Sequence, residues 1–369
     1  MTDNLISRRT LLQGTAAAGA LAATGPLGGL NAQAPLTVGI LYVGPRDDFG
    51  YSQAHAVGAA ELKKVPGVKV VEEENVPETI AVQRSMESMI NLDGAKLIIA
   101  TSFGYFDPHM LAMAAKYPKV EFRHAVGLWD KDKHPQNAGS YFGYLDQAHY
   151  VNGIAAGLVT KSKKIGFVAA KPIPSVLRNI NAVLLGARKN APDATVQVVF
   201  TGDWSVPVRE AEATNALIGS GCDIVTCHVD SPKVVIETAE RRGVMTLGHN
   251  ASQASLAPKG FITGAEYKWS TIYKGFADNL AKNQKLPNWV RGGYDLDFVQ
   301  NTAYGAAATD GARRAADAAI AEIKKGAPIF AGTIKDNKGN VVIPATLDNY
   351  APPLEGMNYL VEGVVGSTT

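Results

Sequence analysis

Short apolar runs alternate with helix-length amphipathic segments along this chain, and this alternation constrains the fold more than any other feature of the sequence. In the first part of the chain we expect strands at 36–43, 68–72, 96–100 and 120–122, separated by helices at 52–64, 80–91 and 110–116. Strands that are apolar on both faces and alternate with helices are typical of a parallel sheet that helices cover on both sides.

The same pattern starts again near residue 164. We expect strands at 164–169, 195–200, 223–227, 243–248 and 261–263, and helices at 175–190 and 270–283. Two successive halves of this kind predict an α/β protein with two doubly wound parallel-sheet lobes.

The boundary between the lobes is placed at 139–143, because this stretch contains no run of strong helix or strand formers and is the expected first crossover. The N-terminal lobe is then 35–143, completed by about 270–293. The C-terminal lobe is 144–269, completed by about 294–369.

Residues 1–34 have the pattern of a twin-arginine export signal. Arg8 and Arg9 precede an uncharged run rich in Ala, Gly and Leu, and Ala32-Gln33-Ala34 offers a small-residue cleavage site. Glycines and a proline interrupt the run, which makes it a poor membrane span; an N-terminal anchor that stays attached is the alternative. We therefore expect a mature chain that is periplasmic and not inserted in the membrane.

Charge and cysteine content exclude several classes of protein. The formal net charge of the 369 residues is only +2, which does not suit a nucleic-acid-binding face. If 223–227 is a strand, the α-carbons of Cys222 and Cys227 lie about 16 Å apart, whereas a disulfide needs about 4.4–6.8 Å. We expect two free, mostly buried thiols.

Ligand-binding residues are expected just after the strands, because ligands of open α/β sheets lie beyond the carboxyl ends of the strands. These positions hold aromatic rings and uncharged or acidic hydrogen-bonding groups, with no cluster of Arg or Lys for a phosphate. Such a set suits a flat heteroaromatic ligand, although a sugar would also accept aromatic rings. Ser52 has the alternative role of a helix cap. The candidates are Phe49, Tyr51, Ser52, Gln53, Ser102, Phe103, Trp204, Asp230, Asn250 and Glu266.

Catalytic motifs are missing from the sequence. It has no phosphate-binding loop, no GxSxG elbow and no HExxH pattern. His228 and His249 are expected at adjacent strand ends, where a hydrogen-bonding role is favoured over a shared metal because no third ligand pattern accompanies them. We expect no catalytic residue, no metal and no cofactor.

Several segments resemble the basic membrane protein family of substrate-binding proteins, whose best-known members are purine-nucleoside receptors. The resemblance covers nearly the whole mature chain in order, and its segments are 38–41 with 47–53, 115–120, 150–157, 164–168 and 329–336. It implies the type I periplasmic binding protein fold. It also implies that the chain is the substrate-binding component of an ABC importer that works with a membrane permease and its ATPase.

The resemblance also implies a ligand site. The family's two stacking aromatics fall on Tyr51 and Trp204, and a neighbouring asparagine falls on Ser52. The aspartate and lysine that hold the ribose fall near Asn250 and near 264–267, where this chain has neither. This difference favours a free, adenine-like purine base over a nucleoside, clamped between the two lobes by stacking, with Glu266 or Asp230 accepting a hydrogen bond from a ring or exocyclic N–H.

Three alternatives remain at this point. One is a sugar-binding protein of the same fold, which would bind ribose and no purine. Another is a periplasmic hydrolase or deaminase that acts on purines, with a metal at His228 and His249. The third is a sensor subunit that reports ligand occupancy to a membrane kinase.

Overall fold

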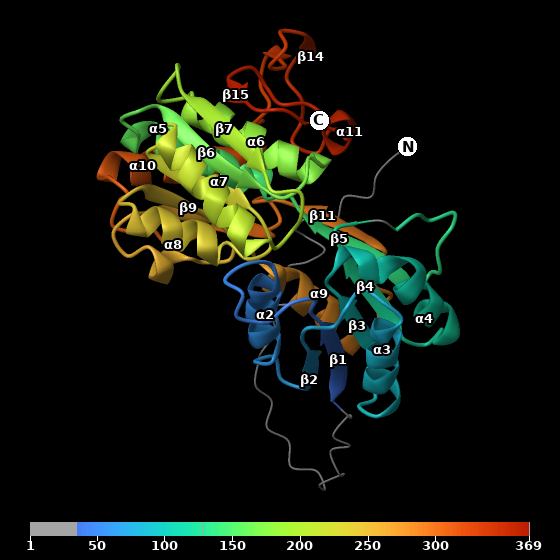
Figure 1. Ribbon diagram of the computed structural model, residues 1–369. Helices are drawn as coiled ribbons and strands as arrows, with labels where there is room; N and C mark the ends of the chain where they lie inside the picture. The colour runs from blue at the N-terminus through green and yellow to red at the C-terminus, as the bar shows by residue number, and fades with distance from the viewer. Residues whose placement is uncertain (1–34, 128, 369) are drawn as a thin grey trace, which may run out of the picture. The chain divides into compact units, whose positions relative to one another are not determined.

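The computed structural model describes residues 35–127 and 129–368, which form two compact units, each with its own sheet (Figure 1). The first unit comprises the described residues up to Val43 together with Ala59–Phe142 and Ser270–Val290. The second comprises Gly44–Gly58, Gly143–Trp269 and the described residues from Arg291 onward. The candidate export signal at 1–34 lies outside the described residues. None of the helices in the described ranges combines the length and apolar character required to cross a bilayer.

The sheet of the first unit has the strand order β11-β5-β4-β3-β1-β2. Neighbouring strands from β2 to β5 pair in parallel, and they follow the 2-1-3-4-5 order of a doubly wound sheet. The strands are β1 (Leu36–Leu41), β2 (Val68–Glu73), β3 (Leu97–Ala100), β4 (Glu121–Ala125), β5 (Ala138–Gly143) and β11 (Trp289–Gly292).

Helices bury apolar side chains against this sheet. In α3 (Ala81–Asn91), Val82, Met86 and Met89 follow helical spacing and belong to one apolar cluster with the strands. In α9 (Trp269–Ala281), Tyr273 and Phe276 contact Tyr141 of β5, with ring centroids 6.0 Å apart in each pair. The other helices are α2 (Tyr51–Leu62), which crosses from one unit to the other, and α4 (Leu111–Lys116).

The sheet of the second unit has the order β12-β10-β9-β8-β6-β7-β15. Its five central strands repeat the 2-1-3-4-5 arrangement as parallel neighbours, whereas β12 is antiparallel to β10 and β15 is parallel to β7. The strands are β6 (Lys164–Ala169), β7 (Thr195–Phe200), β8 (Ile224–His228), β9 (Met245–Asn250), β10 (Phe261–Tyr267), β12 (Val299–Asn301) and β15 (Val364–Val365).

Helices cover this second sheet on both faces, as the uninterrupted apolar strands predict (Figure 1). Side chains of β6 point alternately to two apolar clusters: Phe167 belongs to the cluster under α5, α6 and α10, and Val168 belongs to the cluster under α7 and α8. The helices are α5 (Asp146–Val159), α6 (Pro174–Ala187), α7 (Pro207–Gly219), α8 (Lys233–Arg241) and α10 (Asp310–Lys324). The two doubly wound sheets confirm the predicted fold class.

Glycines allow α5 and α6 to pack with their backbones in contact. A Cβ atom on Gly153 would lie 2.1 Å from the carbonyl oxygen of Val183, and one on Gly186 would lie 2.0 Å from that of Tyr150. Real Cβ atoms do not approach a backbone oxygen so closely, so any side chain at these positions would push the helices apart. The close contact fixes α6 on α5.

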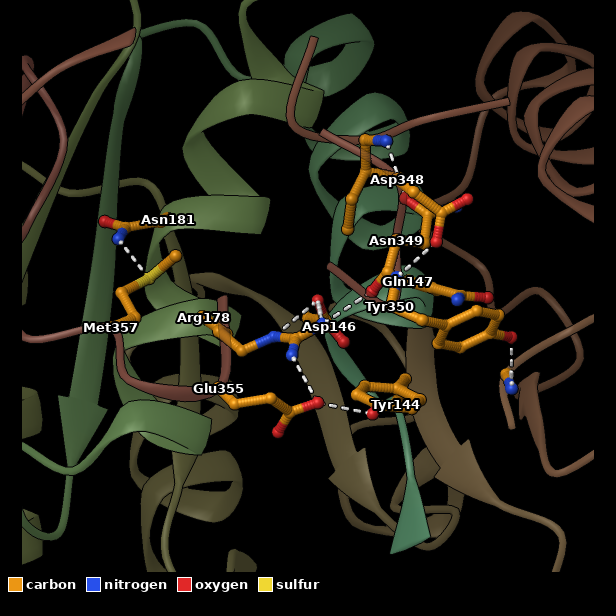
Figure 2. A network of polar contacts seen from close by, with 12 residues as sticks. Tyr144, Asp146, Gln147, Arg178, Asn181, Asp348, Asn349, Tyr350, Glu355 and Met357 are labelled. Atoms are coloured by element: carbon orange, nitrogen blue, oxygen red, sulfur yellow. Dashed lines mark hydrogen bonds and ion pairs between the residues drawn. The ribbon is translucent and has the colours of Figure 1, made fainter. Parts of the chain in front are cut away.

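The C-terminal segment is tied to the same two helices through a buried polar network (Figure 2). Arg178 of α6 donates from Nε and Nη2 to Asp146 Oδ2, over 3.0 and 2.8 Å, and from Nη2 to the carbonyl oxygen of Asn349 over 3.1 Å. Both charged side chains are only 3% exposed. Glu355 accepts a hydrogen bond from the Tyr144 hydroxyl. The remaining elements of this segment are β13 (Ile334–Lys335), β14 (Val341–Ile343) and α11 (Pro352–Glu355).

The structure corrects one expectation and confirms others. The stretch 139–143, which composition left without a strand, is strand β5, because its backbone pairs with β4 and its side chains are mostly buried. Strands β6 and β7 have the predicted bounds. Cys222 and Cys227 are free and buried, as their spacing predicted.

Candidate functional site

The shared strand order places a switch point in each sheet, where successive connections leave in opposite directions. It lies between β1 and β3 in the first unit and between β6 and β8 in the second. Ligands of doubly wound sheets bind beyond the carboxyl ends of the strands at this point. The candidate residues are therefore considered separately for each unit.

The loop after β1 is held by the side chain of Asp48, which caps α2. Its Oδ1 accepts hydrogen bonds from the backbone N–H groups of Gly50 and Gln53 over 2.7 and 2.9 Å, and its Oδ2 accepts one from that of Ser52 over 2.9 Å. Burial raises the pKa of Asp48, and these hydrogen bonds offset part of the increase. Ser52 is 1% exposed at the start of the helix, but the capping carboxylate belongs to Asp48.

Phe49 has the left-handed backbone conformation, with φ of 56°, and its N–H donates to Gln53 Oε1 over 2.9 Å. Its carbonyl oxygen accepts a hydrogen bond from the side chain of Gln253. The ammonium of Lys233 lies 5.6 Å from the centre of its ring. Gln53 is thus occupied in holding the loop, and Phe49 presents a ring beside a cation.

Backbone hydrogen bonds bring three other candidates together in the second unit. The N–H of Tyr51 donates to the carbonyl oxygen of Asp230, and the N–H of Asp230 donates to the carbonyl oxygen of Trp204, each over 2.8 Å. Gly50 allows this approach, because a Cβ atom there would lie 1.9 Å from the Asp230 oxygen. The loops after β1, β7 and β8 therefore meet, although they are far apart in the sequence.

Asn250 and Glu266 are register partners at the carboxyl ends of β9 and β10. Asn250 is 2% exposed and has a φ of 67°, a conformation that asparagine tolerates better than most residues. Glu266 Oε2 accepts a hydrogen bond from Gln300 Nε2 over 2.9 Å, and its Oε1 accepts one from the Thr302 hydroxyl. These two donors orient the carboxylate.

A row of aromatic rings that sequence reasoning did not assign runs from the start of α2 to the start of α9. Tyr51 contacts His55 edge-on at 4.8 Å, and His55 stacks on Trp269 at 4.9 Å. Trp269 stacks in turn on Tyr267 at 4.2 Å. Trp269 is the first residue of a helix that the sequence predicted from residue 270, and an aromatic residue at a predicted helix start was the available signal.

Three histidines form a second cluster at the carboxyl ends of β8 and β9. The rings of His228 and His249 lie 4.2 Å apart, and His249 Nδ1 lies 2.9 Å from His149 Nε2 of α5. His228 Nδ1 lies 2.9 Å from Asn179 Nδ2 of α6. The predicted hydrogen-bonding role of His228 and His249 is confirmed by these contacts. His149 was missed because α5 was not predicted as a helix.

Burial keeps all three of these rings neutral at neutral pH. It lowers the pKa of His228 to about 3. Burial, followed by the charge of neighbouring histidines, lowers the pKa of His249 and of His149 well below the usual range. Across residues 35–127 and 129–368, no three His, Cys, Asp or Glu side chains gather as a ligand set for a metal ion.

The remaining two candidates, Ser102 and Phe103, lie in the first unit after β3. The Ser102 hydroxyl donates to Glu78 Oε1, which also accepts from the N–H of Gly104 over 2.7 Å. The Ser102 carbonyl oxygen lies 2.7 Å from His124 Nε2. Phe103 is 62% exposed. The polar groups here hold the turn, and the ring of Phe103 is open to solvent.

Comparison with known proteins agrees with this architecture. The model of a family described as PnrA-like ABC transporter substrate-binding proteins matches residues 36–297. A purine-binding protein of Brucella abortus is 33% identical over 344 residues, which cover 91% of this chain and 95% of that protein. A putative ABC transporter glucose-binding protein of Haloferax volcanii is 34% identical over 240 residues, covering 65% of this chain and 60% of that protein.

Among solved structures, a solute-binding protein of an ABC transporter system from Conexibacter woesei superposes with a TM-score of 0.67 at 19% identity. The match covers 79% of this chain and 96% of that chain. This likeness supports the type I periplasmic binding protein fold. The family match over 36–297 and the 33% identity to the Brucella abortus protein show that the chain belongs to the PnrA-like, or basic membrane protein, family of ABC transporter substrate-binding proteins.

Proposed function

We propose that this chain is the periplasmic component of an ABC importer that binds a purine base, with adenine as the leading candidate. The observation that supports the proposal is the meeting of Tyr51, Asp230 and Trp204 beyond the strand ends of the second unit. Aromatic rings offer stacking faces to a flat heterocycle, and a carboxylate accepts from its N–H groups. The purine-binding relative in Brucella abortus is 33% identical over nearly the whole chain, and it favours the same ligand class.

A purine base is favoured over a nucleoside because of the residues at position 250 and in the segment 264–267. The resemblance places a ribose-binding aspartate near Asn250 and a lysine-containing segment near 264–267. Here an amide replaces the carboxylate, and Glu266 is already paired with two donors on or beside β12. Neither arrangement supplies the charged pair that would hold ribose hydroxyl groups.

Ligand capture would follow from closure of the two lobes. A ligand that makes contacts with both lobes stabilises the closed form, because only that form makes both sets of contacts. A permease and its ATPase would recognise the closed form. Adenine should then lower the radius of gyration measured by small-angle X-ray scattering, and an unchanged radius at saturating adenine would contradict the trap.

The deciding experiment is calorimetric titration of protein that has been unfolded and refolded to remove co-purified ligand. Adenine, guanine, hypoxanthine, xanthine, adenosine, guanosine, ribose and glucose are titrated in turn. Tight binding of a base, with weaker binding of its nucleoside, supports the proposal. Binding of adenosine without adenine would show that the sugar site has been retained, and failure of every purine would refute the ligand class.

A sugar ligand is the second candidate, because the relative in Haloferax volcanii carries the name of a putative glucose-binding protein. The same titration separates the two: glucose or ribose binding without purine binding would favour it. Export is tested separately by replacing Arg8 and Arg9 with lysine. Loss of the chain from the periplasmic fraction is expected if residues 1–34 act as a twin-arginine signal.

A further inference from the structure

His228 is placed where a doubly wound sheet binds ligands. It is the last residue of β8, and the switch point of the second unit lies between β8 and β6. Its ring centroid is 6.0 Å from that of Trp204, and Asp230 follows two residues later. A flat ligand that stacks on Trp204 would therefore lie close to the edge of the His228 ring.

Asn179 determines which ring nitrogen of His228 carries the proton. It belongs to α6, the helix that leaves β6 on the other side of the switch point, and its Nδ2 lies 2.9 Å from His228 Nδ1. An amide nitrogen can only donate, so Nδ1 accepts this hydrogen bond. In a neutral imidazole the proton then resides on Nε2, which becomes a hydrogen-bond donor.

His228 differs from the two histidines behind it in the environment of its second nitrogen. His149 Nδ1 and His249 Nε2 are enclosed atoms without a hydrogen-bond partner, so no ligand can reach them. His228 Nε2 is not enclosed in this way, and the side chain of His228 is only partly buried. Within the described ranges no protein group accepts a hydrogen bond from it. The Asn179 contact at Nδ1 thus orients the ring, and the N–H at Nε2 is available to donate to a ligand.

We propose that His228 Nε2–H donates to an unprotonated ring nitrogen of the purine and, together with the carboxylate of Asp230 two residues later, selects a 6-aminopurine over a 6-oxopurine. Adenine presents a ring-nitrogen acceptor next to the N6 amino donor on one edge. Guanine and hypoxanthine place an oxygen acceptor where the carboxylate would need a donor. This inference rests on the proposed function and specifies its ligand.

The protonation state of His228 supports the same assignment. Burial holds the pKa of His228 at about 3, so the ring stays neutral with a single proton across the physiological range. No charge change is then required when the ligand binds. Adenine affinity should be constant from about pH 8 to about pH 6 as far as His228 is concerned.

The test compares adenine with its deaza analogues in the wild type and in His228→Phe, which keeps a ring and removes the donor. We expect the substitution to weaken adenine about 10- to 100-fold and to change hypoxanthine binding much less. Either 1-deazaadenine or 7-deazaadenine should bind the wild type as weakly as adenine binds His228→Phe. The same analogue should lose nothing further in the variant, because its missing nitrogen is the partner of His228.

A matched control variant and a conservative variant test whether the loss of affinity comes from the missing donor at His228. His109→Phe removes a histidine of the first unit whose Nδ1 likewise faces an amide nitrogen, that of Gln83, at 3.1 Å, and it should leave adenine affinity unchanged. His228→Gln retains an amide donor and should recover part of the affinity; it also serves if His228→Phe fails to fold. Long-range ¹H–¹⁵N spectra should show the proton on Nε2 in the wild type, and Asn179→Leu should redistribute it between the two nitrogens.

Distinct outcomes separate this inference from the function on which it rests. If the wild type binds no purine, the proposed function fails. If the wild type binds adenine but His228→Phe and both deaza analogues bind equally well, the role of His228 is refuted while purine binding stands. A preference of the wild type for hypoxanthine or guanine would also overturn the proposed selection.

Discussion

The two units share one strand order but use the carboxyl ends of their sheets differently. In the first unit, Glu78 accepts from Ser102 and Gly104, and His124 contacts the Ser102 carbonyl oxygen, so the polar groups after β3 hold their own turn. In the second unit, Trp204 contacts the ring of His228, and no group of the described residues accepts a hydrogen bond from His228 Nε2. Two sheets of the same topology therefore differ in the groups that they present at their strand ends. We expect the ligand specificity to lie in the second unit.

The largest effect is expected from removing Arg178, whose charge is buried against Asp146 in the second unit. Arg178→Met leaves Asp146 as a buried charge without its cation, which costs about 3–5 kcal/mol. Hydrogen exchange should show this loss in α5 and α6 and not in the first unit. Lys163→Met is the control, since its pair with Asp193 is exposed and contributes under about 1 kcal/mol. Equal loss of protection in both units would mean that they unfold as one.

The next effect separates two aromatic candidates, partly buried Trp204 in the second unit and exposed Phe103 in the first. Trp204→Ala should weaken adenine by about 2 kcal/mol, roughly 30-fold, because a stacked ring contributes about 1–3 kcal/mol per base. Phe103→Ala, in the first unit, should weaken it less than about fivefold, since its ring is 62% exposed. Calorimetric titration measures both. A larger loss for Phe103→Ala would reverse the comparison between the units.

Acid should destabilise the second unit before the first. The pKa of His228 is lowered to about 3, so below its usual value of 6.5 the unfolded chain binds a proton that the folded chain does not. The stabilisation is complete above that value and declines as the pH falls, by about 2 kcal/mol at pH 5 for His228 alone.

In the second unit, burial lowers the pKa of three histidines, His149, His228 and His249. In the first unit, burial lowers the pKa of His124 to about 4. Thermal melting and hydrogen exchange at pH 7.5 and pH 5 give the measurement, and His228→Phe should reduce the difference. A first unit that loses protection earlier would contradict this ordering.

The smallest expected effect comes from a matched pair of glutamates, each of which accepts two hydrogen bonds near a strand end. Glu266→Gln in the second unit should weaken adenine about tenfold, because an amide that must donate on one side cannot replace both acceptor oxygens. Glu78→Gln in the first unit should leave adenine affinity unchanged and reduce stability by about 1 kcal/mol. Equal effects of the two substitutions on affinity would show that the first unit also reads the ligand.

Much of the fold was readable from the sequence because buried parallel strands are continuous apolar runs. Strands β6 and β7 were predicted to the residue, whereas β5 was missed because Ala138–Gly143 contains two glycines and few strong strand formers. Its neighbour β4 and the contacts of Tyr141 with α9 determine its conformation. Tertiary packing here outweighs local propensity.

The candidate site was predictable as a set of strand ends, but its internal pairing was not. Nothing in the sequence showed that Asp48, not Ser52, caps α2, or that Asn179 would face His228 from a helix 49 residues earlier. Such contacts depend on how elements distant in sequence are placed in three dimensions. The row from Tyr51 to Tyr267 was missed for the same reason, since it joins two helix starts more than 200 residues apart.

The attachment of the C-terminal segment has a consequence for how the chain folds. Strand β15 adds to β7, Asn349 accepts a hydrogen bond from Arg178 of α6, and Glu355 lies 3.8 Å from the same guanidinium, so the second unit includes residues 349–365. Contacts between such distant segments carry a large loop-closure entropy and slow folding. A nascent chain that has not reached residue 349 can form the core of the first unit's sheet, whereas α6, which carries Asn179, still lacks the hydrogen bonds of Arg178 with Asn349 and of Asn181 with Tyr359. Asn179, and with it the contact that we propose between His228 and the ligand, should thus be among the last parts of the molecule to reach their native positions during synthesis.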